Sequence, residues 1–310
     1  MPDSNTTPGF VSGFVSVLGR PSTGKSTLVN ALVGTKVAAV AGKPQVTRNL
    51  IQGVLTLPMA QIVFVDTPGI HKPDTLFNRR MLETVREALA ERDLLLFVAD
   101  ATMRPGPEDA DAVRLVAGTN TPVFLVLNKI DRVKEKALLL PRIQEYQALH
   151  DFAEYLPVSA LKRDGLDDLR RSILARLPEG PAYFPEDYLT DQPERFLAAE
   201  LIREQIFRQT QREVPHSAAV LVDEWRETPA LTRISATVFV EREGQKAIII
   251  GTKGSMLKAI GTHARLEMER MFGRKVFLEI FVKVQRGWRE DPRFLDQLDW
   301  RSMAGKSEIE

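Results

Sequence analysis

The sequence contains no cysteine and only four histidines, which are widely scattered. A disulfide framework and a thiolate metal site are therefore excluded, and a histidine metal cluster is not expected. No apolar run approaches the roughly 20 residues that a membrane-spanning helix needs. The first residues lack the basic and then apolar pattern of a secretory signal, so we expect a cytoplasmic location.

What is present is enough for two folded domains. The chain has 310 residues, of which 44% are hydrophobic and 27% charged. This length and composition suit about two domains of ordinary size, each with an apolar core. The formal net charge is only +1, but the charges are unevenly distributed along the chain.

A glycine-rich motif near the N-terminus is the strongest functional signal. Residues 19–26, GRPSTGKS, match the phosphate-binding P-loop. The apolar run 14–18 before it predicts a strand, and the spacing of apolar residues over 27–33 predicts a helix. A strand, a glycine-rich loop and a helix N-terminus together present several backbone N–H groups to one anion. The sequence therefore predicts a nucleoside triphosphate site.

Three further motifs specify the base. DTPG at 66–69, NKID at 128–131 and SA at 159–160 each end a predicted strand, at 61–65, 123–127 and 154–158. Open parallel sheets bind their ligands at these strand ends. The carboxylate of Asp131 can accept from both N1–H and the exocyclic amine of guanine, whereas adenine would leave it unpaired. We expect Asn128 to brace the loops, the stem of Lys129 to cover the ring, and the Ala160 N–H to reach guanine O6.

The pattern of elements predicts an α/β fold for the first domain, residues 10–177. Further strands are expected at 51–57 and 94–99, and helices at 79–91, 108–117, 138–150 and 166–177. This alternation predicts a mostly parallel sheet with helices on both faces, and the hairpin 51–65 supplies one antiparallel edge strand. Residues 178–193 are rich in proline and read as a linker that packs against a domain.

The pattern changes from residue 194 onward. We expect helices at 195–211 and 255–271, strands at 218–225, 233–241 and 276–283, and a short apolar segment at 246–250. GTKG at 251–254 lies between this segment and the following helix. A GxxG loop between two helical arms, beside a three-stranded sheet, is the KH arrangement that clamps about four nucleotides of a single strand. Residues 194–290 are therefore predicted to form an α+β KH domain of type 2, followed by a polar tail at 291–310.

Charge supports an RNA-binding role for this half. Residues 246–289 contain ten lysines and arginines against three acidic residues, a net charge of +7. This basic stretch begins close to the GxxG loop. Together, the loop and the positive charge indicate contacts with nucleic-acid phosphates. The predicted RNA contacts are Gly251, Thr252, Lys253, Gly254, Lys258, Arg265 and Lys283.

A P-loop GTPase domain joined to a C-terminal KH domain resembles the Era family of bacterial ribosome-assembly GTPases, and the resemblance spans nearly the whole chain. It extends to PQVTR at 44–48, FPEDYLTD at 184–191, VEREGQK at 240–246, IIGTKG at 249–254 and VKVQRGW at 282–288. The resemblance implies a cytoplasmic GTPase that binds the 3′ end of 16S rRNA on the 30S subunit and assists its maturation. It also implies peripheral association with the inner membrane, and we expect a monomer.

Roles follow for the residues of the nucleotide site, with Mg²⁺ as the expected cofactor. Lys25 would bridge the β- and γ-phosphates, and Ser26, Thr47 and Asp66 would hold Mg²⁺. Thr47, in the loop that resembles the first switch, and the Gly69 N–H would both respond to the γ-phosphate. The expected catalytic residues are Lys25, Thr47, Asp66 and Gly69. The expected GTP contacts are Gly19, Arg20, Pro21, Ser22, Thr23, Gly24, Lys25, Ser26, Thr27, Asp66, Thr67, Pro68, Gly69, Asn128, Lys129, Asp131, Ser159 and Ala160.

Two positions depart from related enzymes. Ile70 stands where Ras-like enzymes have the glutamine that orients water, so we expect slow unaided hydrolysis. Ser22 stands where the Era family usually has an asparagine that, in related GTPases, helps to coordinate potassium. Activation by K⁺ is therefore left open.

Two alternatives remain at this point. One is another GTPase of the same superfamily, acting in tRNA modification or at the membrane, which would need a further domain or an anchor. The other is a KH RNA-binding protein whose G domain is merely structural. The presence of Lys25, Thr47 and Asp66 argues against the second alternative.

Overall fold

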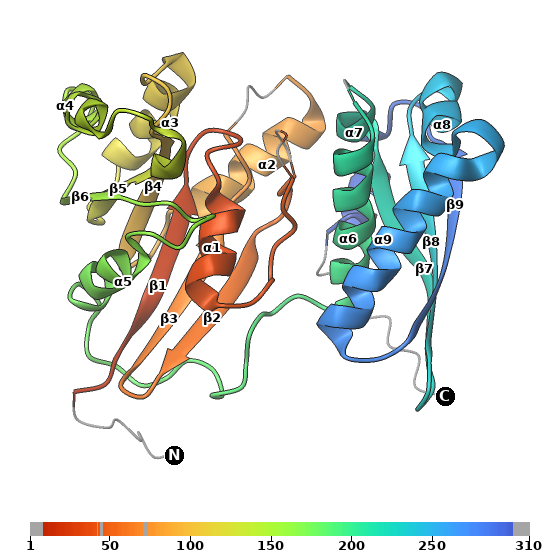
Figure 1. The fold of residues 1–310 in the computed structure, drawn as a ribbon, viewed down its shortest axis with the longest axis horizontal. Coiled ribbons are helices and arrows are strands. Elements are labelled where there is room, and N and C mark those ends of the chain that lie inside the picture. The colour runs from red at the N-terminus through yellow and green to blue at the C-terminus, as the bar shows by residue number, and fades with distance from the viewer. Residues whose placement is uncertain (1–8, 42, 44–45, 71–73, 212, 300–310) are drawn as a thin grey trace. The chain divides into compact units, whose positions relative to one another are not determined.

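Two units make up the fold, and each is described by itself. The structure is a computed structural model that describes residues 9–41, 43, 46–70, 74–211 and 213–299 (Figure 1). The first unit comprises Met1–Ala38, Thr47–Lys72 and Arg80–Asp191. The second comprises Ala39–Val46, Pro73–Arg79 and Gln192–Glu310. Among the described residues, no helix combines the length and the apolar character needed to cross a membrane.

The first unit is built on a sheet of six strands in the order β2-β3-β1-β4-β5-β6. All neighbouring strands run parallel except β2, which pairs antiparallel with β3 at the edge. This confirms the predicted α/β fold with one antiparallel edge strand. The strands are β1 Val11–Leu18, β2 Ile51–Leu57, β3 Ala60–Asp66, β4 Leu94–Asp100, β5 Val123–Asn128 and β6 Glu154–Pro157.

Helices cover both faces of this sheet, as predicted (Figure 1). Alternate residues of the central strands point to opposite faces, so that Leu96 packs with α1 and α5 while Phe97 packs with α3 and α4. The helices are α1 Lys25–Val33, α2 Leu76–Glu87, α3 Pro107–Ala117, α4 Leu139–Gln147 and α5 Leu166–Leu174. Two short 3₁₀ turns follow β5, at Ile130–Arg132 and Lys136–Leu138. With both faces covered, the functional groups are left at the carboxyl ends of the strands.

The proline-rich segment after α5 packs against the first unit. The buried side chain of Gln61 accepts from the N–H groups of Tyr183 and Phe184, at 2.7 and 2.9 Å. It also donates to the carbonyl oxygen of Phe184 at 2.8 Å. Further along, the Val54 N–H donates to the Leu189 carbonyl at 2.9 Å. These contacts hold the segment along the hairpin of β2 and β3, so the segment is not a free linker.

The second unit has a sheet of three strands in the order β7-β8-β9, with β7 antiparallel and β9 parallel to β8. The helices α6, α8 and α9 share one core with the inward residues of the sheet. The elements are α6 Glu194–Gln209, α7 Val214–Ser217, β7 Ala219–Glu227, β8 Thr232–Val240, α8 Glu243–Ile250, a 3₁₀ turn Thr252–Gly254, α9 Ser255–Phe272, β9 Val276–Val284, a 3₁₀ turn Trp288–Glu290 and α10 Pro292–Gln297. This succession is that of the KH domain expected from the sequence.

Several elements differ from the sequence prediction: the short helix α7 was not expected, and α2 spans Leu76–Glu87 rather than 79–91. The apolar segment expected at 246–250 is the end of helix α8, which begins earlier because the Gln245 side chain accepts from the N–H groups of Glu241 and Arg242, both at 3.0 Å. The tail expected at 291–310 begins with α10, whose Phe294 is buried beside Trp288. Trp288 is itself fully buried, and its indole Nε1 donates to a backbone carbonyl at 3.0 Å. Residues 300–310 lie outside the described residues.

Two short segments from the N-terminal half of the chain belong to the second unit. In the first, the Val40 N–H donates to the carboxylate of the fully buried Glu204 at 3.1 Å. In the second, the rings of Phe77 and Trp288 pack edge to face, with centroids 5.4 Å apart. These segments are Ala39–Val46 and Pro73–Arg79, of which residues 42, 44–45 and 73 are not described.

Candidate nucleotide and RNA sites

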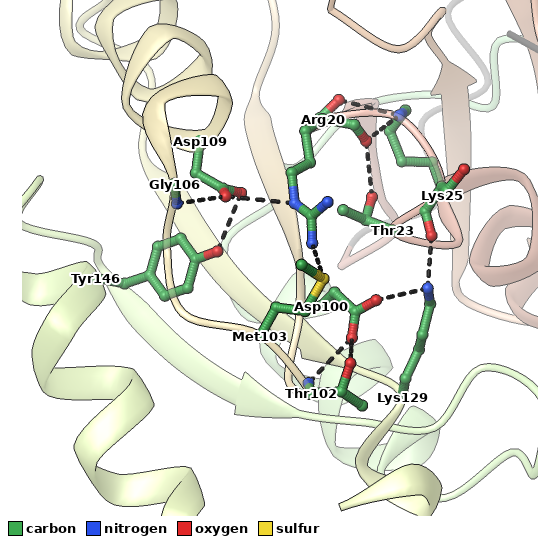
Figure 2. Close-up of polar contacts among 12 residues, drawn as sticks. Arg20, Thr23, Lys25, Asp100, Thr102, Met103, Gly106, Asp109, Lys129 and Tyr146 are labelled. Atoms are coloured by element: carbon green, nitrogen blue, oxygen red, sulfur yellow. Dashed lines mark hydrogen bonds and ion pairs between the residues drawn. The ribbon is translucent and has the colours of Figure 1, made fainter. Parts of the chain in front are cut away.

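The P-loop, residues 19–26, joins β1 to α1 and encloses the ammonium of Lys25. Lys25 Nζ donates to the carbonyl oxygens of Gly19 and Arg20, at 3.0 and 3.1 Å. The Thr23 hydroxyl donates to the same Arg20 carbonyl at 3.2 Å (Figure 2). Because α1 begins at Lys25, its first N–H groups have no partner within the helix and lie where an anion binds.

Burial perturbs the two charged groups at the centre of the site. Burial lowers the pKa of Lys25 to about 8, although the negative charge of Asp66 acts in the opposite direction. Burial raises the pKa of Asp66 to about 6, against the hydrogen bond from Ser26 and the positive charge of Lys25. Both shifts favour the neutral forms. A bound phosphate beside Lys25 and a cation beside Asp66 would restore the charged forms.

The three predicted magnesium ligands come together. Ser26 Oγ lies 2.7 Å from Thr47 Oγ1 and donates to Asp66 Oδ2 at 2.6 Å. The other carboxylate oxygen, Asp66 Oδ1, is buried without a hydrogen-bond partner among the described residues. Two hydroxyls and a carboxylate with a free oxygen are the hard donors that Mg²⁺ prefers. The residues present therefore fit this ion.

The motif after β3 approaches the P-loop closely. The Thr67 hydroxyl donates to the Val17 carbonyl at 2.8 Å, which joins the motif to β1. A Cβ built on Gly69 would lie only 2.9 Å from Cγ of Pro21, so a side chain there would displace the P-loop. The next residue, Ile70, packs against the apolar core between the sheet and helices α3 and α4. It presents no polar group to a water molecule.

Asn128 braces the loops around the predicted base site. Its Nδ2 donates to the Thr23 carbonyl at 2.9 Å, and its Oδ1 accepts from the Ala160 N–H at 3.0 Å. Gly24 is required for this approach, because a Cβ there would lie 2.5 Å from Asn128 Nδ2. The Ala160 N–H, expected to reach guanine O6, contacts Asn128 in this structure.

The remaining base-site residues are held by short contacts. Asp131 Oδ1 accepts from the Ser159 hydroxyl at 2.6 Å, which orients the carboxylate. Lys129 has a left-handed backbone, with φ 69°. Its ammonium donates to the Ser22 carbonyl at 2.5 Å and to Asp100 at 2.7 Å.

Asp100 contacts the predicted base-site residue Lys129, and the sequence analysis did not identify it. It is the last residue of β4, and it pairs with Asn128, the last residue of β5. The hydrogen bonds from Lys129 and Thr102 lower the pKa of Asp100, although burial alone would raise it. The sequence could have indicated Asp100, because this residue follows an apolar run that predicts a buried strand. Asp66 and Asn128 follow such runs in the same way.

The GTKG loop forms the turn between α8 and α9. Gly251 has φ 72°, and a Cβ there would lie 2.7 Å from Cβ of Met256, so this glycine is required by packing. Gly254 has φ 78°, and nothing lies within 4 Å of its missing Cβ. Thr252 and Lys253 are exposed. The loop therefore leaves open space at Gly254, where a sugar-phosphate backbone could approach.

The predicted basic RNA contacts do not all lie together. Lys258 and Arg265 lie two turns apart on α9, the helix that begins at the loop, and Arg265 is in an ion pair with Glu269 at 3.0 Å. Lys283 alternates along β9 with Val282 and Val284, which pack into the core under the helices. It therefore points to the opposite face of the sheet, because successive side chains of a strand alternate.

Two protein families match the two units. The family described as a 50S ribosome-binding GTPase matches residues 14–129, and the KH domain family matches residues 213–289. The P-loop, Asp66, Gly69, Asn128 and Lys129 lie within the first span, whereas Asp131, Ser159 and Ala160 lie beyond its end, and the GTKG loop lies within the second.

The chain is also similar to whole proteins. GTPase Era of Geobacter metallireducens is 50% identical over 293 residues, which covers 94% of this chain and 98% of that protein. GTPase Era of Syntrophus aciditrophicus is 49% identical, covering 94% and 95%. A crystal structure of Era with MgGDPNP and nucleotides 1506–1542 of 16S ribosomal RNA is 41% identical, with a TM-score of 0.91 over 94% of this chain and 99% of that one. A variant of Aquifex aeolicus Era bound to GDP and AlF₄⁻ has the same identity and coverage and a TM-score of 0.90.

Proposed function

The chain belongs to the Era family of GTPases, and on that premise we propose that it is a GTP-controlled protein that binds the 3′ end of 16S rRNA and assists assembly of the 30S subunit. The observation that carries the proposal is the similarity, over 94% of this chain, to Era in complex with MgGDPNP and nucleotides 1506–1542 of 16S ribosomal RNA. The nucleotide motifs of the first unit and the GTKG loop of the second support this proposal.

In this proposal the nucleotide is held by the groups already described. The ammonium of Lys25 binds the β- and γ-phosphates, and the carboxylate of Asp131 reads the guanine edge. Ser26, Thr47 and Asp66 hold Mg²⁺, which when bound neutralises charge on the phosphate oxygens. The Thr47 hydroxyl and the Gly69 N–H respond to the γ-phosphate and lose their contacts when it leaves. Hydrolysis is slow without a partner, because Ile70 packs into the core and does not orient water.

The chain connectivity supports control of RNA binding by the nucleotide. Thr47 directly follows Ala39–Val46, and Pro73–Arg79 begins four residues after Gly69. Both segments belong to the unit that contains the KH domain. A change at Thr47 or Gly69 is therefore transmitted along a few residues of chain to segments held by Glu204 and Trp288.

Fluorescence anisotropy tests this function. The probe is a labelled oligonucleotide with the 3′-terminal sequence of 16S rRNA, with a scrambled oligonucleotide as control, and the protein is loaded with GDPNP or GDP. We expect the GDPNP form to bind at least about fivefold more tightly, a coupling of about 1 kcal/mol. Equal affinities would reject the switch and leave RNA binding intact, whereas failure to prefer the 16S sequence would reject the rRNA assignment.

The proposal also covers cellular location, oligomeric state, membrane association and the monovalent cation. We propose a cytoplasmic monomer, for which the absence of cysteine is suitable. Peripheral membrane association, which the family resemblance implies, is tested by sedimentation with anionic vesicles. Potassium activation is tested by comparing hydrolysis in KCl and NaCl, with Ser22→Asn as the variant that restores the usual residue of the family.

A further inference from the structure

The side chain of Arg20 leaves the P-loop on the side of α3 and α4. Its backbone carbonyl accepts from Lys25 Nζ, while its guanidinium reaches a second set of groups (Figure 2). The guanidinium Nη2 donates to Met103 Sδ at 3.2 Å. Its Nε lies 3.3 Å from Asp109 Oδ2 as an ion pair, without an aligned hydrogen bond. One residue of the P-loop thus connects the phosphate-binding lysine to a carboxylate outside all four nucleotide motifs.

Asp109 is a buried and fully engaged carboxylate. Only 2% of its side chain is exposed. Oδ2 accepts from the Gly106 N–H at 3.0 Å, and Oδ1 accepts from the hydroxyl of Tyr146 on α4 at 3.0 Å (Figure 2). Burial raises the pKa of Tyr146, and the nearby charge of Asp109 acts in the same direction, so this hydroxyl stays a donor. A carboxylate removed from water in this way is costly unless it is paired.

The pairing constrains the backbone on which Lys25 rests. Pro21 restricts the preceding residue, Arg20, to extended conformations, which limits the direction of its carbonyl. The contact with Asp109 holds the other end of Arg20. With the side chain anchored and the backbone restricted, the carbonyl remains directed toward Lys25 Nζ and the Thr23 hydroxyl. The P-loop therefore keeps its shape before any phosphate arrives.

We propose that Asp109, held by Tyr146, is a positioning residue for nucleotide binding that acts through Arg20 on the P-loop. In this proposal neither Asp109 nor Tyr146 contacts the phosphates of the nucleotide. Removal of the charge of Asp109 frees the guanidinium, lets the Arg20 carbonyl turn away, and leaves Lys25 less well placed for the β-phosphate. Because GDP and GTP share that phosphate, both lose affinity together. This inference rests on the GTP-binding role of the P-loop and refines it.

The test measures binding of fluorescent GDP and GTP analogues to the full-length protein. Asp109→Asn keeps the shape and an acceptor for the Gly106 N–H, and it should weaken the binding of both nucleotides by about tenfold, which corresponds to about 1.4 kcal/mol. Asp111→Asn is the matched control on the same helix, since Asp111 is exposed and paired only with Arg114 among the described residues. This control should change neither affinity.

A double-mutant cycle separates positioning from general loss of stability. In an Arg20→Met background, Asp109→Asn should have less than about a twofold effect, because its route to the P-loop has been removed. Equal losses with Arg20 present and with Arg20 replaced would overturn the proposal. A wild-type protein that binds no guanine nucleotide would instead refute the proposed function itself.

A more conservative pair of variants tests the proposal if the Asp109→Asn protein does not fold. Tyr146→Phe removes only the hydroxyl, and it should weaken GDP and GTP about threefold while circular dichroism shows a folded protein. Tyr155→Phe is its control, because Tyr155 packs against the same core while its hydroxyl makes no hydrogen bond among the described residues. If Tyr146→Phe is folded and binds like the wild type, the proposal is wrong.

Discussion

The hydroxyl oxygens of Ser26 and Thr47 lie 2.7 Å apart, although the two residues are 21 positions apart in the sequence. Both also contact the carboxylate of Asp66, at 2.6 and 3.3 Å. The P-loop, the first switch and the strand β3 thus meet at a single oxygen-rich point. A cation bound at this point would contact all three segments, so that a displacement of one would alter the contacts of the other two.

The first prediction concerns base choice. Asp131→Asn should weaken GTP by at least about tenfold and tighten xanthosine triphosphate, because the carboxamide can donate to the new carbonyl while the carboxylate cannot. Competition against a fluorescent GDP analogue measures both constants. Asp151→Asn, at an exposed position, is the control. If the wild-type protein bound ATP as tightly as GTP, the role of Asp131 would be refuted.

The second prediction concerns the residue after Gly69. Ile70→Ala removes packing against the core of the first unit and no group that could polarise water. Intrinsic turnover should stay within about tenfold of the wild type, which corresponds to less than about 1.4 kcal/mol in the barrier. Single-turnover hydrolysis of GTP gives the rate directly. A thousandfold loss would show that Ile70 takes part in catalysis.

The third prediction is a pH dependence. Burial lowers the pKa of Lys25 to about 8 in the nucleotide-free site, and a bound phosphate raises it again. At pH 9 Lys25 should therefore take up close to one proton on nucleotide binding, whereas at pH 7 its uptake of about a tenth of a proton is offset by a similar release from Asp66, whose pKa burial raises to about 6. Affinity should fall as the pH rises above 8, by up to about tenfold for each unit.

Calorimetry in buffers of different ionisation enthalpy counts these protons. The terminal phosphates of GDP and GTP are already ionised above pH 8 and do not contribute to the uptake, whereas the guanine N1–H, which starts to ionise near pH 9, adds a minor share. Binding at pH 9 without proton uptake would mean that Lys25 is charged in the free protein.

The fourth prediction concerns the GxxG loop. Gly254→Asp should abolish binding of the 16S oligonucleotide and spare GTP binding, because it places an anion in the open space where phosphate approaches. Gly273→Asp is a matched control at the other end of α9. Gly273 also has a left-handed backbone, with φ 67°, and nothing within 4 Å of its missing Cβ. The two variants therefore add the same charge and a similar strain of roughly 1 kcal/mol. Undiminished binding by Gly254→Asp would reject the KH site.

The fifth prediction separates phosphate contacts on the two faces of the KH unit. Lys253→Ala and Lys258→Ala should each weaken RNA binding modestly and reduce the slope of log K against log salt by about one unit or less. Lys283→Ala should leave the slope unchanged, since this side chain lies on the face of β9 opposite the helices. An equal effect of Lys283→Ala would show that the RNA also reaches that face.

Much of the fold could be predicted from hydrophobic pattern. The runs that became β4 and β5 are apolar on both faces, which predicts buried parallel strands, and the structure has them. Helix α8 was less visible, because its first turn is polar and is fixed by one hydrogen-bonding side chain, Gln245. Helix α10 depends on the burial of Phe294, which a polar sequence context conceals.

The nucleotide motifs were visible because each one is contiguous and ends a strand. Asp109 and Tyr146 were not, since nothing near them in the sequence indicates that α3 and α4 meet behind the P-loop. The position of Lys283 could have been derived, because Val282 and Val284 already show which face of β9 is buried. Tertiary contacts between distant elements are what the sequence pattern leaves out.

The position of Trp288 and the other tryptophans has a practical consequence for fluorescence spectroscopy. The chain has three tryptophans, Trp225, Trp288 and Trp300, and all of them belong to the second unit. Intrinsic tryptophan emission therefore reports on the second unit, which contains the KH domain, and does not report on the first unit, which contains the nucleotide motifs. A chromophore carried by the nucleotide reports on the first unit alone. The wild-type protein thus offers two optically separate signals, from which the unfolding of each unit can be recorded in one sample without a label on the chain.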